Sequence, residues 1–348
     1  MRFCHPARAA LQALMLMLAL LAAAPAAAQS ADGRLIVDTA WVERALQRGA
    51  VLWDARSPRE YAEGHIAGAV NFGAAGDLFR DPNREDPPSA AVAAQLFGQA
   101  GIDILRQEVV VYAQRGDPMA YFAARMTEYY GGRHAKVYHG GLDDWRAAGK
   151  AVTPEPTKRP PVQLALRDER VGTLWTHEVV DRVRAGGAQI LDTRTPREFS
   201  GDDIRAIRGG HVSGAVNVPY EANWVDPQAA VKLAARQVAT RDGMTLKPEA
   251  ELKALYAGLD PKKETVVYCQ SGVRASETAA VLRDLGFANV KVYEPSWLGY
   301  AGVLSAPADN EVFVNVGALN GQISALQGRL RALEDELAKQ RTQPAPQR

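Results

Sequence analysis

The chain of 348 residues carries one sequence pattern twice, and this internal repeat limits the possible folds more than any other feature. Each copy holds three blocks in the same order. The blocks lie at residues 51–61, 64–71 and 109–116 in the first copy and at 190–199, 210–217 and 265–272 in the second. Solenoid repeats are much shorter, so a repeat of this length indicates a duplicated domain. We therefore expect two domains of related fold.

Each copy alternates short β-rich runs with helix-like stretches. This alternation predicts βα units on a mainly parallel sheet, and hence an α/β fold in which helices flank each sheet. The expected strands lie at residues 50–53, 109–112, 136–138, 189–192, 265–268 and 290–293. The expected helices include residues 118–130 and 274–285.

A stretch rich in proline and poor in apolar residues separates the two copies, as is typical of a linker. We place the linker at residues 153–161, between an N-terminal domain at 30–152 and a C-terminal domain at 162–308.

The N-terminus combines a basic segment, the apolar stretch Leu11 to Ala24 and a run of small residues that ends at Ala28. This order is typical of a cleaved signal peptide, which we assign to residues 1–28. A membrane anchor is the alternative, but the apolar core falls short of the roughly 20 residues that a spanning helix needs. We expect an exported protein without stable membrane insertion, periplasmic if the source is a Gram-negative bacterium.

Charge and cysteine content limit the partners and the means of stabilisation. The formal net charge is +1 and the basic residues are scattered, so the chain shows no electrostatic footprint for nucleic acid. One cysteine remains after removal of residues 1–28, which excludes an internal disulfide. Stability must therefore come from packed cores.

That cysteine, Cys269, opens a loop directly after the apolar run Thr265 to Tyr268. A strand that stops at a cysteine and turns into a helix points backbone N–H groups and the positive end of a helix dipole at the sulfur, which favours the thiolate. Gly272 permits a positive φ, and Arg274 adds a permanent cation for an anionic substrate. The alternative is a small buried hydrophobe, as free cysteines often are. The composition of the loop favours a nucleophile.

These motifs resemble those of the rhodanese superfamily, specifically the tandem-domain thiosulfate and 3-mercaptopyruvate sulfurtransferases. The resemblance is carried by Asp192 to Phe199, Gly210 to Ala215 and Cys269 to Ala275, and it spans about residues 34–305. It implies two tandem rhodanese-like domains, of which only the C-terminal one is catalytic.

The first copy lacks the residues that this chemistry needs. Ala113 stands at the position of Cys269, and Asp117-Pro118 replace Val273-Arg274. Alanine has no nucleophilic atom, so this copy cannot carry sulfur. The resemblance implies that it forms one wall of a cleft at the domain interface.

The resemblance also implies a ping-pong mechanism without cofactor or metal. The Cys269 thiolate would take the outer sulfur of a small anionic donor such as thiosulfate and become a persulfide. A thiol or cyanide acceptor would then remove that sulfur.

Residues of the Cys269 loop and two arginines are the candidate substrate-binding groups. We expect the backbone N–H groups of the loop to hold the persulfide, and Arg274 and Arg197 to bind the anionic end of the donor. Asp192 is expected to order the site by hydrogen bonds, and His211 to fix an adjacent loop. The substrate-binding set is Arg274, Arg197, Gln270, Ser271, Gly272, Val273 and Ala275.

The residues inside the loop do not decide which of two molecules is the sulfur donor. Ser271 to Val273 match the mercaptopyruvate enzymes, which usually continue with threonine, whereas this chain has Arg274. A cation at the end of the loop favours a dianion. We therefore rank thiosulfate first and 3-mercaptopyruvate second.

Three other functional classes compete with this interpretation. A related phosphatase or arsenate reductase needs a larger ring than the four residues that separate Cys269 and Arg274. A redox relay would need an external thiol, because no second cysteine can resolve a disulfide. A persulfide carrier or partner-docking module with little turnover is compatible with the same loop.

Beyond the second copy, residues 316–341 predict an amphipathic helix and residues 342–348 a disordered tail. Apolar residues recur at alternating spacings of four and three, at Leu319, Ile323, Leu326, Leu330, Leu333 and Leu337. The run is shorter than the roughly three to four heptads that identify a coiled coil firmly. The helix could pack on its own domain or bind another protein. The separating segment Ala306 to Asn310 favours a homo-oligomer.

Overall fold

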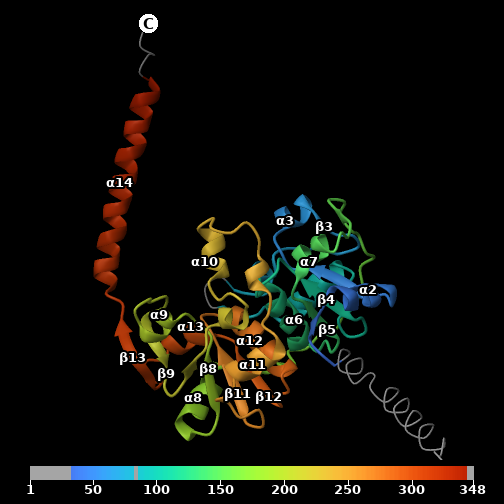
Figure 1. Ribbon diagram of the computed structural model, residues 1–348. Coiled ribbons are helices and arrows are strands. Elements are labelled where there is room, and N and C mark those ends of the chain that lie inside the picture. Colours follow the sequence, from blue (N-terminus) through green and yellow to red (C-terminus); the bar gives the residue numbers. More distant parts are fainter. Residues whose placement is uncertain (1–32, 82–84, 343–348) are drawn as a thin grey trace, which may run out of the picture.

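The computed structural model describes residues 33–81 and 85–342 of the chain (Figure 1). The predicted signal peptide and residues 343–348 of the expected tail lie outside the described residues. Two α/β domains follow one another, and a long helix comes last.

The described part of the first copy is built on a parallel sheet of order β1-β5-β4-β2. The strands are β1 (Ile36–Val37), β2 (Val51–Asp54), β4 (Val109–Tyr112) and β5 (Ala135–Tyr138). The helices are α2 (Thr39–Gln47), α3 (Pro58–Glu63), α4 (Ala75–Leu78), α5 (Ala90–Gln99), α6 (Met119–Tyr129) and α7 (Gly141–Ala147). An antiparallel pair of β3 (His65–Ile66) and β6 (Val152–Thr153) lies beside it. Every residue of β2 and β4 is buried, because helices cover both faces of a parallel sheet.

The second copy repeats this plan with a parallel sheet of order β10-β8-β11-β12-β7. The strands are β7 (Thr173–Leu174), β8 (Gln189–Asp192), β10 (Val216–Asn217), β11 (Glu264–Tyr268) and β12 (Asn289–Tyr293). The helices are α8 (Thr176–Ala185), α9 (Pro196–Ser200), α10 (Ala229–Ala234), α11 (Glu249–Leu255), α12 (Val273–Asp284) and α13 (Ser296–Ala301), with 3₁₀ turns η1 (Tyr220–Asn223) and η2 (Asp242–Met244). An antiparallel pair joins β9 (Arg208–Val212) to β13 (Ala308–Phe313). The expectation of two domains with parallel sheets is confirmed.

The first repeated block folds in the same way in both copies. In each, a strand ends at an aspartate whose carboxylate binds the arginine two residues later, Asp54 with Arg56 and Asp192 with Arg194. A capping box then starts the next helix: Thr195 caps α9, its side chain accepts from the Glu198 N–H, and the Glu198 carboxylate accepts from the Thr195 N–H. Identical local chemistry therefore produces the same strand-turn-helix twice.

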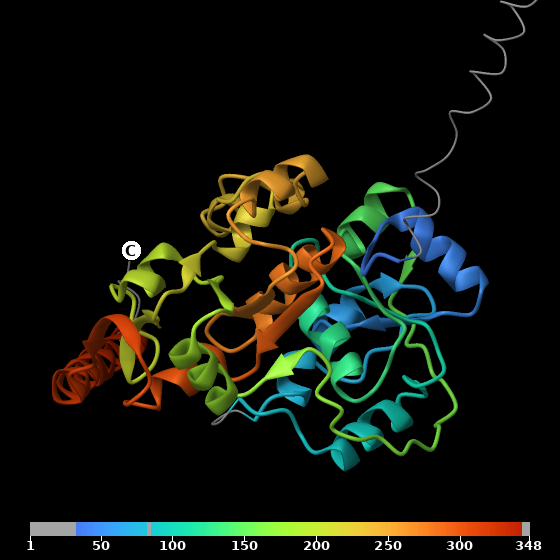
Figure 2. The same cartoon turned by 90° about the horizontal axis from the view of Figure 1, so that it is seen from below.

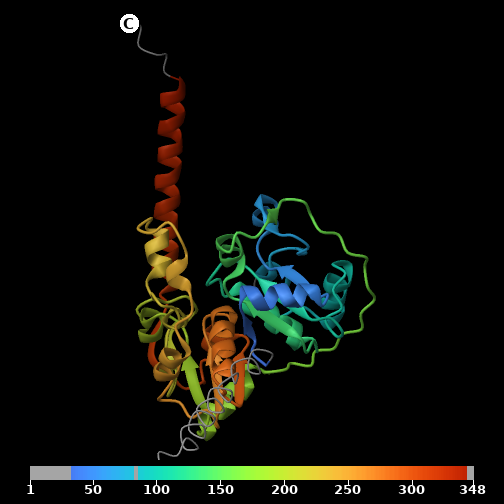
Figure 3. The ribbon, with the colours of Figure 1, turned by 45° about the vertical axis from the view of Figure 1, so that its right-hand side comes forward.

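The segment that connects the domains is wound onto the N-terminal domain (Figure 3). The Val162 N–H donates to the Gly98 carbonyl at 2.9 Å, and the Arg170 N–H donates to the Tyr129 carbonyl at 3.1 Å. Leu164 and Leu166 pack against the N-terminal core. The connection is thus attached along most of its length until β7 begins.

Charged groups in the domain interface are buried and paired. The Glu294 carboxylate, at the end of β12, is inaccessible to solvent and lies 3.0 Å from Arg80 Nη2 and 2.5 Å from Arg125 Nη1. Burial disfavours a charged carboxylate, but the two arginines outweigh it and hold the pKa of Glu294 below its usual value. Helices α6 and α12 pack against each other around this network.

The last helix, α14 (Val316–Thr342), leaves the C-terminal domain and extends away from both domains (Figures 1 and 2). Figure 2 shows it nearly end-on, on the side of the C-terminal domain that is remote from the N-terminal domain. Its side chains from Gly317 to Lys339 are exposed. No helix among the described residues is long and apolar enough to cross a membrane.

Substitution Glu294→Gln should destabilise the protein strongly, because it removes the buried counter-charge of Arg125 and leaves Arg80 with only the more distant Glu85 carboxylate, at 3.6 Å. We expect a loss of about 3–5 kcal/mol in the free energy of unfolding, measured with urea. Glu128→Gln is the matched control: Glu128 also pairs across the interface, with Arg283 at 2.8 Å, but that arginine is 43% exposed. Its removal should cost about 1 kcal/mol or less. Equal losses in the two variants would contradict the special role of Glu294.

Candidate active site

Cys269 lies in the turn that connects β11 to α12, as the sequence predicts. Gly272 precedes the first residue of α12 and has φ +82°, the left-handed conformation that favours glycine. The Gly272 N–H points at the Cys269 sulfur, with 3.1 Å between N and Sγ. A Cβ atom on Gly272 would lie 2.9 Å from both the Glu294 carbonyl and Arg80 Nη2, so a side chain at this position would also collide with its surroundings.

Helix α13 anchors the other side of the loop. The Cys269 N–H donates to Ser296 Oγ at 3.2 Å, and the Cys269 carbonyl accepts from the Trp297 N–H at 3.0 Å. Ser296 is buried and has φ +48°, an uncommon conformation for a residue with a side chain. Such strain persists where the surrounding structure enforces it, which is common at functional sites.

The thiol itself is enclosed, since only 1% of Cys269 is exposed. It belongs to an apolar cluster that includes Leu191, Val267 and Ala275. A core cysteine would show the same burial, so the assignment of a nucleophile depends on the geometry of the loop and on its charged neighbours. A substrate can reach the sulfur only if the surrounding groups move.

Arg274, the cation expected to bind the donor, is already engaged. Its two terminal nitrogens donate to the two carboxylate oxygens of Glu198, each at 2.8 Å. Burial opposes its charge, but the hydrogen bonds to Glu198 and the attraction of Cys269 raise its pKa, so Arg274 stays charged. The side chain remains 18% exposed. Arg274 therefore faces the thiol as a cation whose charge is largely balanced.

Glu198 carries the opposite half of this pair from α9. It is completely buried and also serves in the capping box with Thr195. Burial by itself would raise the pKa of Glu198, but the hydrogen bonds and charge of Arg274, together with Thr195, lower it to about 2.

Two further carboxyl groups belong to Glu221, which is partly buried on η1, and Glu277, which is buried on α12. Trp224 Nε1 donates to Glu277 Oε1 at 2.8 Å, and the second oxygen of Glu277 has no hydrogen-bond partner among the described residues. Burial raises the pKa of Glu277 well above its usual value and also raises that of Glu221. Both shifts favour the neutral acids, which do not compete with an anionic donor for Arg274.

The remaining loop residues differ in their surroundings. Gln270 Nε2 donates to the Arg205 carbonyl at 2.8 Å, while the buried Oε1 of Gln270 has no partner among the described residues. Val273 packs against the core of the N-terminal domain, and Ala275 is fully buried. Ser271 is partly exposed.

The surroundings of Arg197 differ from those of Arg274. It lies on α9 next to Glu198 and is exposed. Its carbonyl oxygen accepts from the Asp203 N–H at 2.9 Å. Among the described residues no contact brings its guanidinium to the thiol.

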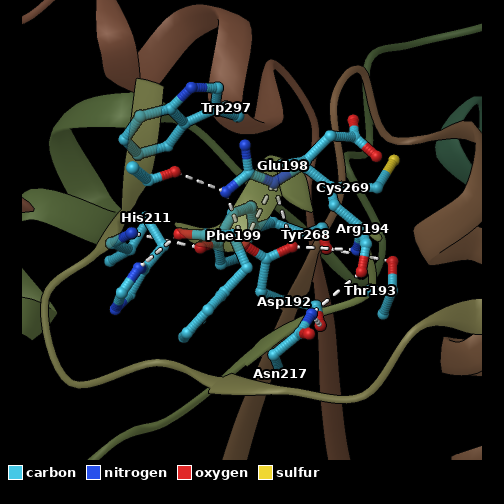
Figure 4. Close-up of polar contacts among 12 residues, drawn as sticks. Asp192, Thr193, Arg194, Glu198, Phe199, His211, Asn217, Tyr268, Cys269 and Trp297 are labelled. Atoms are coloured by element: carbon cyan, nitrogen blue, oxygen red, sulfur yellow. Dashed lines mark hydrogen bonds and ion pairs between the residues drawn. The ribbon is translucent and has the colours of Figure 1, made fainter. Parts of the chain in front are cut away.

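Asp192 and His211 have the geometry of structural supports (Figure 4). Asp192 is inaccessible to solvent and accepts hydrogen bonds from the Arg194 guanidinium at 2.6–3.0 Å. Arg194 in turn donates to the Gly210 carbonyl at 2.7 Å. His211 stacks on Phe199 with 3.5 Å between ring centroids, and its Nδ1 lies 2.8 Å from the Phe199 carbonyl. Together these contacts fix α9, which carries Glu198.

Sequence reasoning missed the arginines that the N-terminal domain brings to this loop. Arg125 Nε donates to Ser276 Oγ at 2.9 Å, one turn into α12. Arg80 Nη2 lies close enough to Gly272 to collide with a Cβ atom there. Both arginines lie outside the repeated blocks, so no pattern could identify them. Glu198 stands inside a block, and only its pairing with Arg274 was unforeseen.

The corresponding loop of the first copy is closed by the second domain. A Cβ atom on Gly116 would lie 2.5 Å from Met244, which packs directly onto this loop. Arg115 forms an ion pair with Asp242. His139 Nε2 lies 2.9 Å from the Met244 carbonyl. The loop that has alanine in place of the nucleophile thus forms part of the domain interface.

The sequence model of the Rhodanese-like domain matches this chain in two segments, residues 38–148 and 176–302. The chain belongs to the rhodanese family. A thiosulfate sulfurtransferase of Corynebacterium glutamicum is 33% identical over 262 residues, which cover 72% of this chain and 81% of that protein. A protein of Mycolicibacterium smegmatis, named provisionally as a thiosulfate sulfurtransferase, is 30% identical over 79% of this chain and 97% of its own length.

Solved structures share the rhodanese fold. The 3-mercaptopyruvate sulfurtransferase SseA of Escherichia coli is 25% identical, with a TM-score of 0.62, and the match covers 76% of this chain and 99% of SseA. The anaerobic ergothioneine biosynthesis enzyme of Chlorobium limicola has a TM-score of 0.64 at 19% identity, covering 79% of this chain and 69% of that one. The chain is therefore a tandem rhodanese whose relatives are named sulfurtransferases.

The Glu198–Arg274 pair should make stability depend on acid pH. The pKa of Glu198 is lowered from 4.5 to about 2 in the folded protein, so its contribution is complete above the unfolded value and disappears as pH falls towards 2. The difference in unfolding free energy between the unmodified protein and Glu198→Gln should be constant above about pH 6 and shrink below about pH 5. Urea unfolding at a series of pH values measures this difference. Glu251→Gln, on the exposed face of α11, is the control and should show no such trend.

Proposed function

We propose that the protein is an exported sulfurtransferase that moves a sulfane sulfur from thiosulfate to a thiol or cyanide acceptor through a persulfide on Cys269. The observation that carries this proposal is the placement of the Cys269 sulfur at the N-terminus of α12, where the Gly272 N–H points at it and Arg274 lies close by. Amide donors and a helix N-terminus stabilise both a thiolate and a persulfide anion.

The transfer balances without an external oxidant or reductant. The Cys269 thiolate attacks the outer sulfur of thiosulfate, a new S–S bond forms, and the old S–S bond breaks with its electron pair leaving on sulfite. An acceptor thiolate or cyanide then attacks the outer sulfur of the persulfide, and the Cys269 thiolate is regenerated. Two simple displacements at one sulfur explain why the site contains a nucleophile and cations.

The donor anion is proposed to bind at Arg274, with Arg197 at the outer edge of the site. Arg274 can keep one carboxylate contact and still present its exposed edge to a second anion, since guanidinium has five N–H donors. Asp192, through Arg194, and His211 are proposed to support α9 and thereby the position of Glu198.

A 3-mercaptopyruvate sulfurtransferase is the second candidate. Ser271 to Val273 favour it, and so does the similarity to SseA over almost the whole length of that protein. A persulfide carrier that docks a partner protein would use the same intermediate with little turnover. The periplasm is the proposed location, on the strength of the N-terminal sequence alone.

Incubation with thiosulfate should add one sulfur atom to the protein, measured as intact mass. The gain should be absent in Cys269→Ser and retained in Ser271→Ala, which keeps the nucleophile. Sulfur loading from 3-mercaptopyruvate but not from thiosulfate would select the second candidate. Loading without multiple turnover to cyanide or a small thiol would identify the carrier.

Failure to load from any sulfane donor would contradict the proposed chemistry. A small aryl phosphate tests the phosphatase alternative in parallel. Robust hydrolysis that Cys269→Ala abolishes would replace sulfur transfer with phosphate chemistry.

Arg274→Ala should lower kcat/KM for thiosulfate by about 10- to 100-fold, the value of a charged hydrogen bond. Arg274→Ala also leaves the buried Glu198 carboxylate without its partner. The double variant Glu198→Gln/Arg274→Ala removes that carboxylate too, and so isolates the effect of losing the cation. The single variant and the double variant should show the same loss of kcat/KM for thiosulfate. Arg197→Ala should have a smaller effect. Arg184→Ala, on the remote helix α8, should have none, and unchanged kinetics in Arg274→Ala would remove that residue from the site.

A further inference from the structure

Helix α14 exposes an apolar stripe that neither domain covers. It runs for 27 residues away from the C-terminal domain (Figure 1). Leucine and isoleucine side chains along it are 43–63% exposed, at Leu319, Ile323, Leu326, Leu330, Leu333 and Leu337. Isolated helices are marginally stable in water, and most helices gain their stability by burying an apolar face. The alternative in which this helix packs on its own domain does not occur in the structure.

The stripe follows a heptad repeat throughout. Counting from Val316 as position a, the a positions are Val316, Ile323, Leu330 and Leu337, and the d positions are Leu319, Leu326 and Leu333. Apolar residues therefore occupy seven successive core positions. β-Branched residues at a with leucine at d favour two-stranded parallel coiled coils, and the first two heptads have this combination.

Charges beside the stripe distinguish between the two orientations of a pair. In a parallel pair, each g residue faces the e residue five positions further along the other helix. Arg329 at g then meets Glu334 of the second copy, and Gln322 meets Gln327. In a fully overlapping antiparallel pair, g faces g, and Arg329 would meet its own copy across the symmetry axis. Opposite charges thus favour the parallel arrangement.

The start of the helix also suits such an arrangement. Asn315 Oδ1 accepts from the Ala318 N–H at 3.0 Å and caps the first turn. Only Val314 and Asn315 separate α14 from β13, which is paired with β9 in the domain. A short, capped junction lets two copies of the helix begin side by side while their domains lie at the same end.

We propose that α14 forms a parallel two-stranded coiled coil with α14 of a second copy of this chain. The dimer would carry two catalytic domains at one end of the coiled coil. Its existence does not depend on the proposed sulfur chemistry.

Light scattering on the chain from residue 29 to 348 should give twice the monomer mass at micromolar concentration. The double variant Leu326→Asp/Leu330→Asp should be monomeric. The folding of its two domains and its sulfur loading should be unchanged, because both substitutions lie outside the domains. A monomeric unmodified protein, or a trimer or larger assembly, would overturn the proposal.

Charge exchange tests the pairing directly. Arg329→Glu and Glu334→Arg should each raise the dimer dissociation constant about tenfold, since both g–e pairs become repulsive. An equimolar mixture of the two variants should restore the affinity. Arg331→Glu, the same charge change at position b away from the stripe, is the matched control.

Orientation is tested by cross-linking. In the Cys269→Ser background, Leu319→Cys should form an intermolecular disulfide on mild oxidation, because two copies of a d residue near one end of the helix face each other only in the parallel pair. Arg331→Cys should not cross-link. Dimers that fail to cross-link at position 319 and are not restored by mixing the charge variants would contradict the parallel arrangement.

Discussion

One buried carboxylate, Glu294, connects the assembly of the two domains with the geometry of the Cys269 loop. Glu294 directly follows strand β12 of the C-terminal domain, and its two partners, Arg80 and Arg125, come from the N-terminal domain. Ser296, which binds the Cys269 backbone, follows only two residues later. A charge at this depth is tolerable only when it is paired, so we expect the Cys269 loop to keep its shape only when the N-terminal domain is in place.

The two copies show how one scaffold serves two purposes. Both keep the aspartate–arginine pair and the capping box, because these contacts make the strand-turn-helix fold irrespective of chemistry. In the second copy the capping glutamate also neutralises Arg274, the cation next to the thiol. In the first copy Pro118 stands in place of that arginine, and Met244 of the other domain packs against the loop. The copy that has alanine at this position thus uses the corresponding loop as part of the domain interface.

Local patterns predicted the parallel sheets, the turn from β11 into α12 and the positive φ of Gly272, because each depends on a few neighbouring residues. The partner of Arg274 could not be predicted, since Glu198 lies 76 residues away and its motif already explained it as a helix cap. Arg80 and Arg125 were also out of reach, because arginine in an unrepeated segment does not indicate which surface it will meet. The burial of Cys269 could not be predicted either, because it depends on how elements that are distant in the sequence pack together. The sequence thus predicted the position of Cys269 and the shape of its loop, and the structure revealed which residues surround them.

The path of the interdomain connection limits how the enclosed thiol can become accessible. Its backbone is hydrogen-bonded to the N-terminal domain at Arg170, and the Gly172 carbonyl already accepts from the Val292 N–H in the C-terminal sheet at 2.8 Å. Only Val171 lies between these two hydrogen-bonded residues, so this part of the connection cannot extend further. The domains therefore stay at a very high effective concentration, so even a broken interface would close again quickly. A motion that exposes the thiol would therefore turn about residues 170–172, where the two attachments leave the chain little freedom.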